Sequence, residues 1–244
     1  MPLQGGDIYV GASAYADRLN VLYKKVIDNT NPQNLSAYQG QRLEDEASAA
    51  KFAYSYGFLA GYKVPLSVTG LYVALEGDML RHRGVASGGL GGVGASAGRN
   101  QLGEVWPENW TLERNRSFGL TARAGAGIPF FGTWLGPSIY GLIGLRRLGA
   151  GFESRYSGCL TETTCTEPED FVSGSQGFRD TFNGWTVGGG VETKAGAFSI
   201  RAELRITDYS AVERVIRFDE QFVSSPLNLD PDSITLGIGL LWYF

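Results

Sequence analysis

Residues 233–244 read SITLGIGLLWYF, with a large apolar side chain at every second position. The apolar face consists of Ile234, Leu236, Ile238, Leu240, Trp242 and Phe244. The opposite face is mostly small or polar, as Ser233, Gly237 and Gly239 illustrate. Alternation with a period of two is typical of a β-strand. A face of large residues opposite a face of tiny ones favours the wall of a narrow closed barrel, whose interior leaves little room for side chains.

The same alternation recurs along the chain and predicts eight strands. They cover residues 7–17, 50–64, 68–83, 115–128, 135–152, 181–194, 197–209 and 232–244. Each is at least as long as the roughly 9–11 tilted residues with which a strand crosses an outer membrane. Within 138–149 both faces are apolar, so the direction in which its side chains point stays open.

The connections between these strands alternate in length. Three are short, and the other four, at 18–49, 84–114, 153–180 and 210–231, are long. Short turns on one side and long loops on the other are typical of up-and-down barrels of the outer membrane. We therefore expect an all-β fold with residues 1–244 in a single domain: an eight-stranded antiparallel up-and-down transmembrane β-barrel with three short periplasmic turns and four long extracellular loops. The alternative fold is a soluble lipocalin-like barrel.

The composition argues against several other classes of protein. Gly accounts for 35 of 244 residues without a triplet repeat, so a collagen is excluded, and a hydrophobic share of 43% excludes a disordered chain. The 21 basic and 25 acidic residues form no basic patch, so nucleic acid is not an expected partner. No apolar run is long enough for a membrane helix. The chain begins MPLQGG, without the pattern of a leader, so we expect either that there was no leader or that a leader was removed and Met1 replaces it.

Two cysteines, Cys159 and Cys165, flank a polar segment rich in Thr. The chain has a single histidine, His82, so a zinc site lacks ligands, and we predict no metal and no cofactor. The pair instead predicts a small disulfide loop formed in an oxidising compartment, with two free thiols as the alternative.

Charged residues also occur on the faces of the predicted strands that point into the barrel. These are Glu76, Asp78, Arg123, Glu192, Arg201, Glu203 and Arg205. Their charges nearly cancel, as the interior requires, because an isolated buried charge is very costly. Eight strands leave an interior that side chains fill, whereas open channels need about sixteen strands. We therefore predict a plugged polar network, with a selective pore as the alternative.

Aromatic residues lie near both ends of the predicted strands and suggest the two belts of a membrane protein. The predicted interface aromatics are Tyr62, Trp134, Trp185, Phe198 and Tyr209. His82 lies between Arg81 and Arg83 without a Ser at strand spacing, so we predict a rim residue that touches lipopolysaccharide phosphates rather than a catalytic base. The glycines of 88–94 match G-x-G-x-x-G, but no helix follows, so we predict a flexible surface loop.

Motifs in the last third of the chain carry a resemblance to a known family. They are GWTVGGGVE at 184–192, SIRAELR at 199–205, TDY at 207–209 and the terminal LWYF at 241–244. With them, the chain resembles the opacity-protein-like outer-membrane β-barrel family, the small porin-like surface antigens of alphaproteobacterial type. The hairpin residues 193–197 depart from the family's apolar hairpin, and 153–180 is longer than expected. The resemblance implies that the barrel-assembly machinery reads Trp242 and Phe244 as an assembly signal.

From these observations we expect a non-enzymatic, monomeric surface antigen of the bacterial outer membrane that supports envelope integrity. Its expected partners are outer-membrane lipids and lipopolysaccharide, the barrel-assembly machinery during biogenesis, and an extracellular protein or glycan that contacts the long loops. Mixed charged and aromatic residues in 18–49 and 210–231 suit such a contact, and they equally suit a solvated shield without a partner. The alternatives are a narrow porin for small solutes and an outer-membrane enzyme that modifies lipid A.

Overall fold

The computed structural model of the protein describes residues 5–66, 70–94, 101–128, 136–159 and 171–244. Its strands are β1 (Asp7–Asp28), β2 (Arg42–Pro65), β3 (Leu71–Arg83), β4 (Val85–Leu90), β5 (Glu108–Gly127), β6 (Gly136–Cys159), β7 (Phe171–Ala195), β8 (Phe198–Tyr209), β9 (Val212–Phe218) and β10 (Val223–Tyr243). A short 3₁₀ turn, η2 (Asp219–Gln221), precedes β10. Within the described ranges, no helix is both long enough and apolar enough to cross a membrane.

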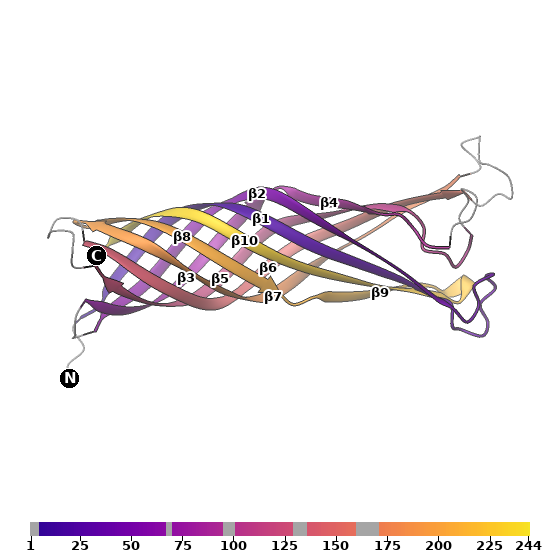
Figure 1. The fold of residues 1–244 in the computed structure, drawn as a ribbon, viewed down its shortest axis with the longest axis horizontal. Helices are drawn as coiled ribbons and strands as arrows, with labels where there is room; N and C mark the ends of the chain where they lie inside the picture. The colour runs from indigo at the N-terminus through magenta and orange to yellow at the C-terminus, as the bar shows by residue number, and fades with distance from the viewer. Residues whose placement is uncertain (1–4, 67–69, 95–100, 129–135, 160–170) are drawn as a thin grey trace.

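All neighbouring strands pair in antiparallel fashion, and the sheet closes on itself because β1 pairs with both β2 and β10. Strands β3 and β4 lie end to end along β5, separated at Gly84, whose φ is 110°. Strands β8 and β9 lie end to end along β10 in the same way. We call each line of the barrel wall a stave, whether it is one long strand or two strands that lie end to end. The barrel therefore has eight staves, which confirms the predicted eight-stranded antiparallel barrel (Figure 1).

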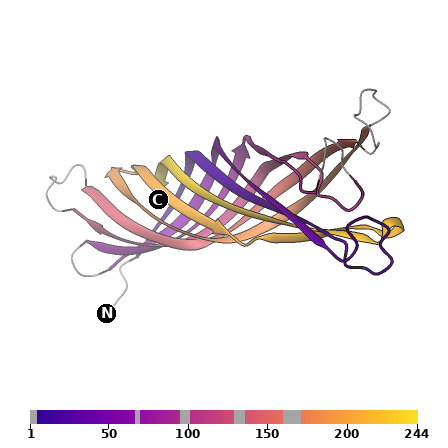
Figure 2. The ribbon, with the colours of Figure 1, turned by 45° about the vertical axis from the view of Figure 1, so that its right-hand side comes forward.

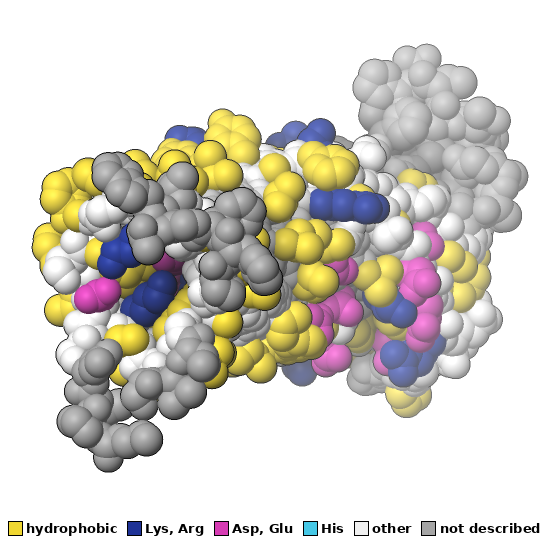
Figure 3. Space-filling model, turned by 60° about the vertical axis from the view of Figure 1, so that its left-hand side comes forward, with side chains coloured by type: hydrophobic (Ala, Val, Ile, Leu, Met, Phe, Trp, Pro, Cys, Tyr) yellow, Lys and Arg dark blue, Asp and Glu magenta, His cyan; other side chains and the backbone are white. Residues whose placement is uncertain are grey.

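The half of the barrel that holds both termini has an apolar outer wall. Outward side chains such as Phe58, Ile143 and Ile238 are 69%, 61% and 65% exposed. In Figure 3, hydrophobic side chains cover the outer wall of this half, and charged side chains gather farther along. Exposed apolar surface on this scale requires a lipid environment, because in water it drives association. This half is the membrane-spanning part of the barrel.

Beyond the apolar wall the staves continue, and their apolar side turns inward. In β1 the outward Ile8 and Val10 give way to the buried Leu19, Val21 and Tyr23. We call this part the extension, and it comprises β4, β9 and residues 19–28, 42–52, 108–115, 148–159, 171–183 and 223–232. Its core contains Leu19, Val21, Tyr23, Ala86, Leu90, Trp110, Leu112, Leu148, Ala150, Phe152, Phe182, Tyr209, Leu227 and Leu229. An apolar core with a polar outer surface is the arrangement of a protein in water.

The extension divides into two sheets, which separate towards the far end of the molecule (Figures 1 and 2). One sheet is β4–β5–β6–β7 and the other is β9–β10–β1–β2. Within the described residues, no ladder joins β4 to β2 or β9 to β7. The core described above fills the space between the two sheets, as in a β-sandwich.

The predicted long loops are wrong in extent, because most of their residues form strands of the extension. The Gly-rich segment shows the difference best, since β4 occupies part of it and pairs with β5. Glycine is required at Gly88, where a Cβ atom would lie 2.6 Å from Cζ2 of the buried Trp110. The close approach of a buried ring, rather than loop flexibility, explains this glycine.

Candidate functional site

The structure places all seven predicted interior charges inside the barrel, where none is more than 6% exposed. Glu76 on β3 lies at their centre. Its Oε1 atom is 2.5 Å from Nη2 of Arg123, and its Oε2 atom is 2.8 Å from Nη1 of Arg201. The hydroxyl of Tyr9 donates a further hydrogen bond of 2.9 Å to Oε2. Charge-assisted contacts of this kind balance the cost of burying the carboxylate.

Two further carboxylates extend this network along the barrel axis. Asp78 Oδ2 lies 2.8 Å from Nη2 of Arg146 and 2.9 Å from Nη1 of Arg205, which also contacts Glu203. Towards the short-turn end, Glu192 Oε1 accepts a hydrogen bond of 2.5 Å from the hydroxyl of Tyr243.

The network includes members that the sequence analysis missed. They are Tyr9, Lys63, Tyr140, Arg146 and Tyr243. Arg146 lies in the segment whose facing stayed open. The network draws side chains from all eight staves, through β1, β2, β3, β5, β6, β7, β8 and β10. Polar side chains therefore fill the centre of the barrel.

A second buried cluster lies where the membrane-spanning part meets the extension. The Nε2 atom of His82 is 2.8 Å from the hydroxyl of Ser117, and its Nδ1 atom is 3.4 Å from Oδ2 of Asp17. Arg114 donates to Asp17 at 3.3 Å, and Arg146 donates to the Ser117 hydroxyl at 2.8 Å. The prediction that His82 is a rim residue facing lipopolysaccharide is therefore wrong, because its ring points into the barrel and is buried.

The order Asp17–His82–Ser117 is that of a catalytic triad, in which an acid orients a histidine that activates a hydroxyl. The surroundings do not suit a reaction. Ser117 is fully buried, and its ladder partner on β6 is Leu148 of the apolar core. The guanidinium of Arg146 also occupies the Ser117 oxygen as a hydrogen-bond donor. The Ser117 hydroxyl is therefore enclosed by Leu148 and by the guanidinium of Arg146.

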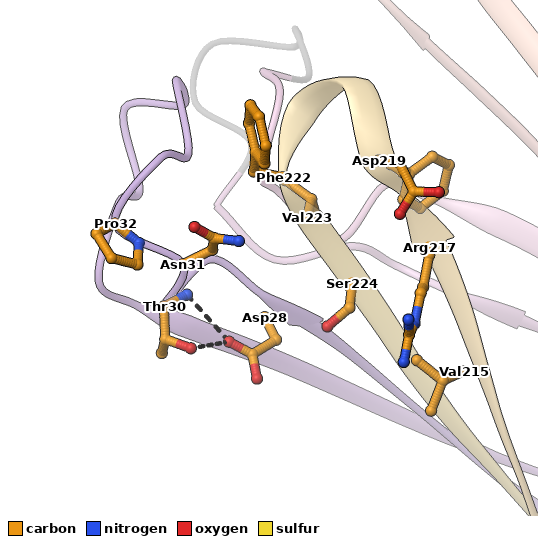
Figure 4. Close-up of a pocket in the computed structure, with 11 residues that line it drawn as sticks. Asp28, Thr30, Asn31, Pro32, Val215, Arg217, Asp219, Phe222, Val223 and Ser224 are labelled. Carbon is orange, nitrogen blue, oxygen red and sulfur yellow. Dashed lines mark hydrogen bonds between the residues drawn. The ribbon is translucent and has the colours of Figure 1, made fainter.

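A cavity of about 600 Å³ opens at the far end of the extension, between the connection after β1 and the hairpin of β9 and β10 (Figure 4). Asp28 lies at one side of it and accepts hydrogen bonds from Thr30, 3.0 Å from the amide and 2.6 Å from the hydroxyl. These hydrogen bonds hold the pKa of Asp28 below its ordinary value. Arg217 and Phe218 line the other side, so the cavity presents both charges and an aromatic ring.

A second cavity, of about 280 Å³, lies between the two sheets of the extension. Its lining combines the aromatic rings of Trp106, Tyr156 and Phe218 with polar side chains that include Gln176. The Nε2 atom of Gln176 is buried and has no hydrogen-bond partner among the described residues. We call this space the distal cavity. Its rings and its unpaired amide group suit a polar ligand with apolar faces.

The predicted interface aromatics divide into two groups. Tyr62, Trp185 and Phe198 point outward and are nearly half exposed, and the Phe198 ring lies 4.5 Å from that of Trp242. Tyr209, in contrast, is 3% exposed and packs inside the extension, so its placement at the interface is wrong. The reason is that Tyr209 lies beyond the level at which the apolar side turns inward.

Some predictions concern residues outside those that the structure describes. Trp134 and Cys165 belong to this group, as does the side chain of Cys159, so the disulfide stays a prediction. Trp242 and Phe244 are exposed on the outer wall, and their role as an assembly signal also stays a prediction.

No protein-family model matches the chain, and no curated protein matches its sequence. Among solved structures, the chain is similar to Neisserial surface protein A, with 14% identity and a TM-score of 0.42 over 99% of this chain and 100% of that one. It is also similar to the outer membrane protease OmpT from Escherichia coli, with 8% identity and a TM-score of 0.47 over 100% of this chain and 99% of that one. A third similar structure is Ail, the attachment invasion locus protein of Yersinia pestis, with 14% identity and a TM-score of 0.31 over 95% and 99% of the two chains.

Proposed function

We propose that the protein is a non-enzymatic barrel of the bacterial outer membrane that holds a rigid binding platform outside the bilayer. The observation that carries this proposal is the inward turn of the apolar side along single staves, as between Val10 and Leu19 in β1. The same strands suit lipid in one half and water in the other, so the extension is fixed to the membrane without a flexible linker. A surface antigen that supports envelope integrity fits this arrangement.

The filled interior argues against the alternative of a narrow porin. Glu76 and its arginine partners occupy the axis of the membrane-spanning part, and the apolar core occupies the extension above them. Planar-bilayer recording of the purified protein tests this point. We expect no steady conductance above that of the detergent control, whereas a steady, large conductance would contradict the closed barrel.

Among the residues that the structure describes, the triad-like order of Asp17, His82 and Ser117 favours an enzyme. Treatment with a fluorophosphonate probe tests it, since the probe labels activated serines. We expect no labelling of Ser117 and no change in lipid A mass when the protein is expressed. Labelling that disappears in Ser117→Ala would favour the enzyme instead.

The distal cavity is the best candidate for the binding site of the platform, and its chemistry suits a glycan. The rings of Trp106 and Tyr156 offer faces on which sugars stack, and the Gln176 amide offers a free donor to a hydroxyl group. A panel of glycans applied to the detergent-purified protein tests this. We expect binding that Trp106→Ala weakens and that Trp185→Ala, a matched change on the outer wall, leaves intact. Equal binding by both variants would remove the distal cavity from the proposal.

A further inference from the structure

Four arginines lie on the outside of the barrel at the level where its apolar wall ends. They are Arg81 and Arg83 on β3, Arg116 on β5 and Arg147 on β6, and all four are exposed. We call them the arginine cluster. Two positions nearer the short-turn end on the same outward faces lie Met79, Phe118 and Leu145, which are 43%, 55% and 67% exposed. The guanidinium groups therefore begin where the lipid-facing surface stops.

The cluster concentrates positive charge without internal compensation. Arg81 and Arg116 are direct partners in the antiparallel ladder of β3 and β5, and Arg147 pairs with Phe118, next but one to Arg116. Like charges directly opposite each other destabilise a sheet. Within the described part of the chain, no carboxylate lies within ion-pair distance of any of the four, although other exposed basic residues such as Lys24 and Arg155 have one.

The charge at this level differs around the barrel, and β1 presents the exposed Arg18 beside β10. On β8 and β10, at the corresponding end of the apolar wall, the outward residues include Asp208 and Asp232. These strands lie across the barrel from β3 and β5 in the closed strand order. A side chain of either charge would stay hydrated at the membrane surface. A side of the barrel that carries several arginines therefore favours an anionic ligand.

We propose that the arginine cluster binds the phosphate groups of lipids in the leaflet that surrounds the base of the extension. Guanidinium groups bind phosphate through paired hydrogen bonds, and an anion held between Arg81 and Arg116 would relieve their mutual repulsion. The apolar wall directly below receives the acyl chains of the same lipid. The combination of cations above and apolar side chains below favours an amphiphilic anion. A soluble anion would contact the arginines alone and would make no contact with the apolar wall.

Thermal unfolding in a neutral detergent, followed by the change in gel mobility of the heated protein, tests the proposal. The variant Arg81→Gln/Arg116→Gln is compared with the wild type and with Arg42→Gln/Arg155→Gln, a matched control that removes two exposed arginines of the extension. Each protein is measured alone, with purified lipopolysaccharide, with its dephosphorylated form and with inorganic phosphate. Without lipid, the cluster variant is expected to melt at the same temperature as the wild type or higher, because a repulsion is removed.

With lipopolysaccharide, the wild type and the control are expected to gain stability and the cluster variant to gain little, with an affinity weaker by about tenfold or more. Dephosphorylated lipid and inorganic phosphate are expected to leave all three unchanged. Equal stabilisation of the wild type by the phosphorylated and dephosphorylated lipids would overturn the proposal, as would an equal gain by the cluster variant. Equal stabilisation by inorganic phosphate would overturn the lipid as its source. If the cluster variant does not fold, Arg81→Lys/Arg116→Lys replaces it, and its expected affinity lies below that of the wild type because the paired hydrogen bonds are lost.

Discussion

The imidazole of His82 lies 2.8 Å from the hydroxyl of Ser117, which belongs to the neighbouring stave. Both residues are buried, and Ser117 keeps its hydrogen bond from Arg146 when the imidazole is removed. We expect His82→Ala to lower the free energy of unfolding by about 0.5–1.5 kcal/mol, the net contribution of one hydrogen bond. Thermal unfolding in detergent measures the change. A variant as stable as the wild type would show that water replaces the imidazole without cost.

Removal of the carboxylate at the centre of the interior network is expected to have a larger effect. Glu76 contacts both Arg123 and Arg201, so Glu76→Ala leaves two buried guanidinium groups without their shared partner. The expected loss of stability is about 3–5 kcal/mol, the range for breaking a buried ion pair from one side. Urea unfolding of the protein in lipid vesicles measures it. Glu113→Gln is the control, because Glu113 lies exposed on the outside of β5.

A methyl group at Gly88 is expected to disturb the extension and leave the membrane-spanning part folded. The added Cβ atom of Gly88→Ala would lie 2.6 Å from Cζ2 of Trp110, so the ring must move within a packed core. Such overpacking costs about 1–3 kcal/mol. The expected result is faster proteolysis of the extension with unchanged heat-modified gel mobility. Gly91→Ala is the matched control, since nothing lies within 4 Å of its added Cβ. Equal proteolysis of both variants would contradict the packing argument.

The hydrogen bonds from Thr30 set the acid response of the loop that carries them. They depress the pKa of Asp28 below the ordinary value of 3.8, so their stabilisation is present above that value and is lost as the pH falls through the depressed pKa. Thr30→Val removes the hydroxyl donor and keeps the amide donor, and the pKa of Asp28 is expected to move part of the way back. Titration of the labelled Asp28 carboxyl carbon by NMR measures the shift. Thr30→Ser, which retains a hydroxyl, is expected to titrate like the wild type.

The sequence predicted the membrane-spanning part well because lipid on one side and a crowded interior on the other impose a single alternation. The extension was missed because the alternation continues with its sides exchanged. In β1, the outward even positions are apolar from Ile8 to Ala16, and the inward odd positions are apolar from Leu19 to Tyr23. Because the apolar pattern of the outward face stops here, the sequence predicts the end of a strand at this point. The signal was present in Leu19, Val21 and Tyr23, which occupy three successive inward positions of β1.

The residues of a candidate site could be predicted only where their position follows from the alternation within a single strand. Interior charges such as Glu76 and Arg201 follow from the inward side of a predicted strand. The contact of His82 with Ser117 depends instead on the register between strands and on the irregularity of β5 between Arg114 and Ser117, which changes the side on which the following residues lie. Neither the register between strands nor the irregularity of β5 can be predicted from the spacing of residues along the chain. The unpaired amide of Gln176 in the distal cavity likewise becomes visible only when the two sheets face each other.

The level at which the apolar side turns inward also fixes how deep the protein sits. If the barrel rose or sank by one pair of residues along β1, either Arg18 would enter hydrocarbon or Ile8 would leave it. Mismatch between apolar wall and bilayer costs fractions of a kcal/mol for each ångström, and here it would act on eight staves at once. The height of the apolar wall therefore indicates the thickness of the membrane to which the protein is adapted. In a thicker bilayer, the lipids around the barrel would have to thin locally, because the height of the wall is fixed.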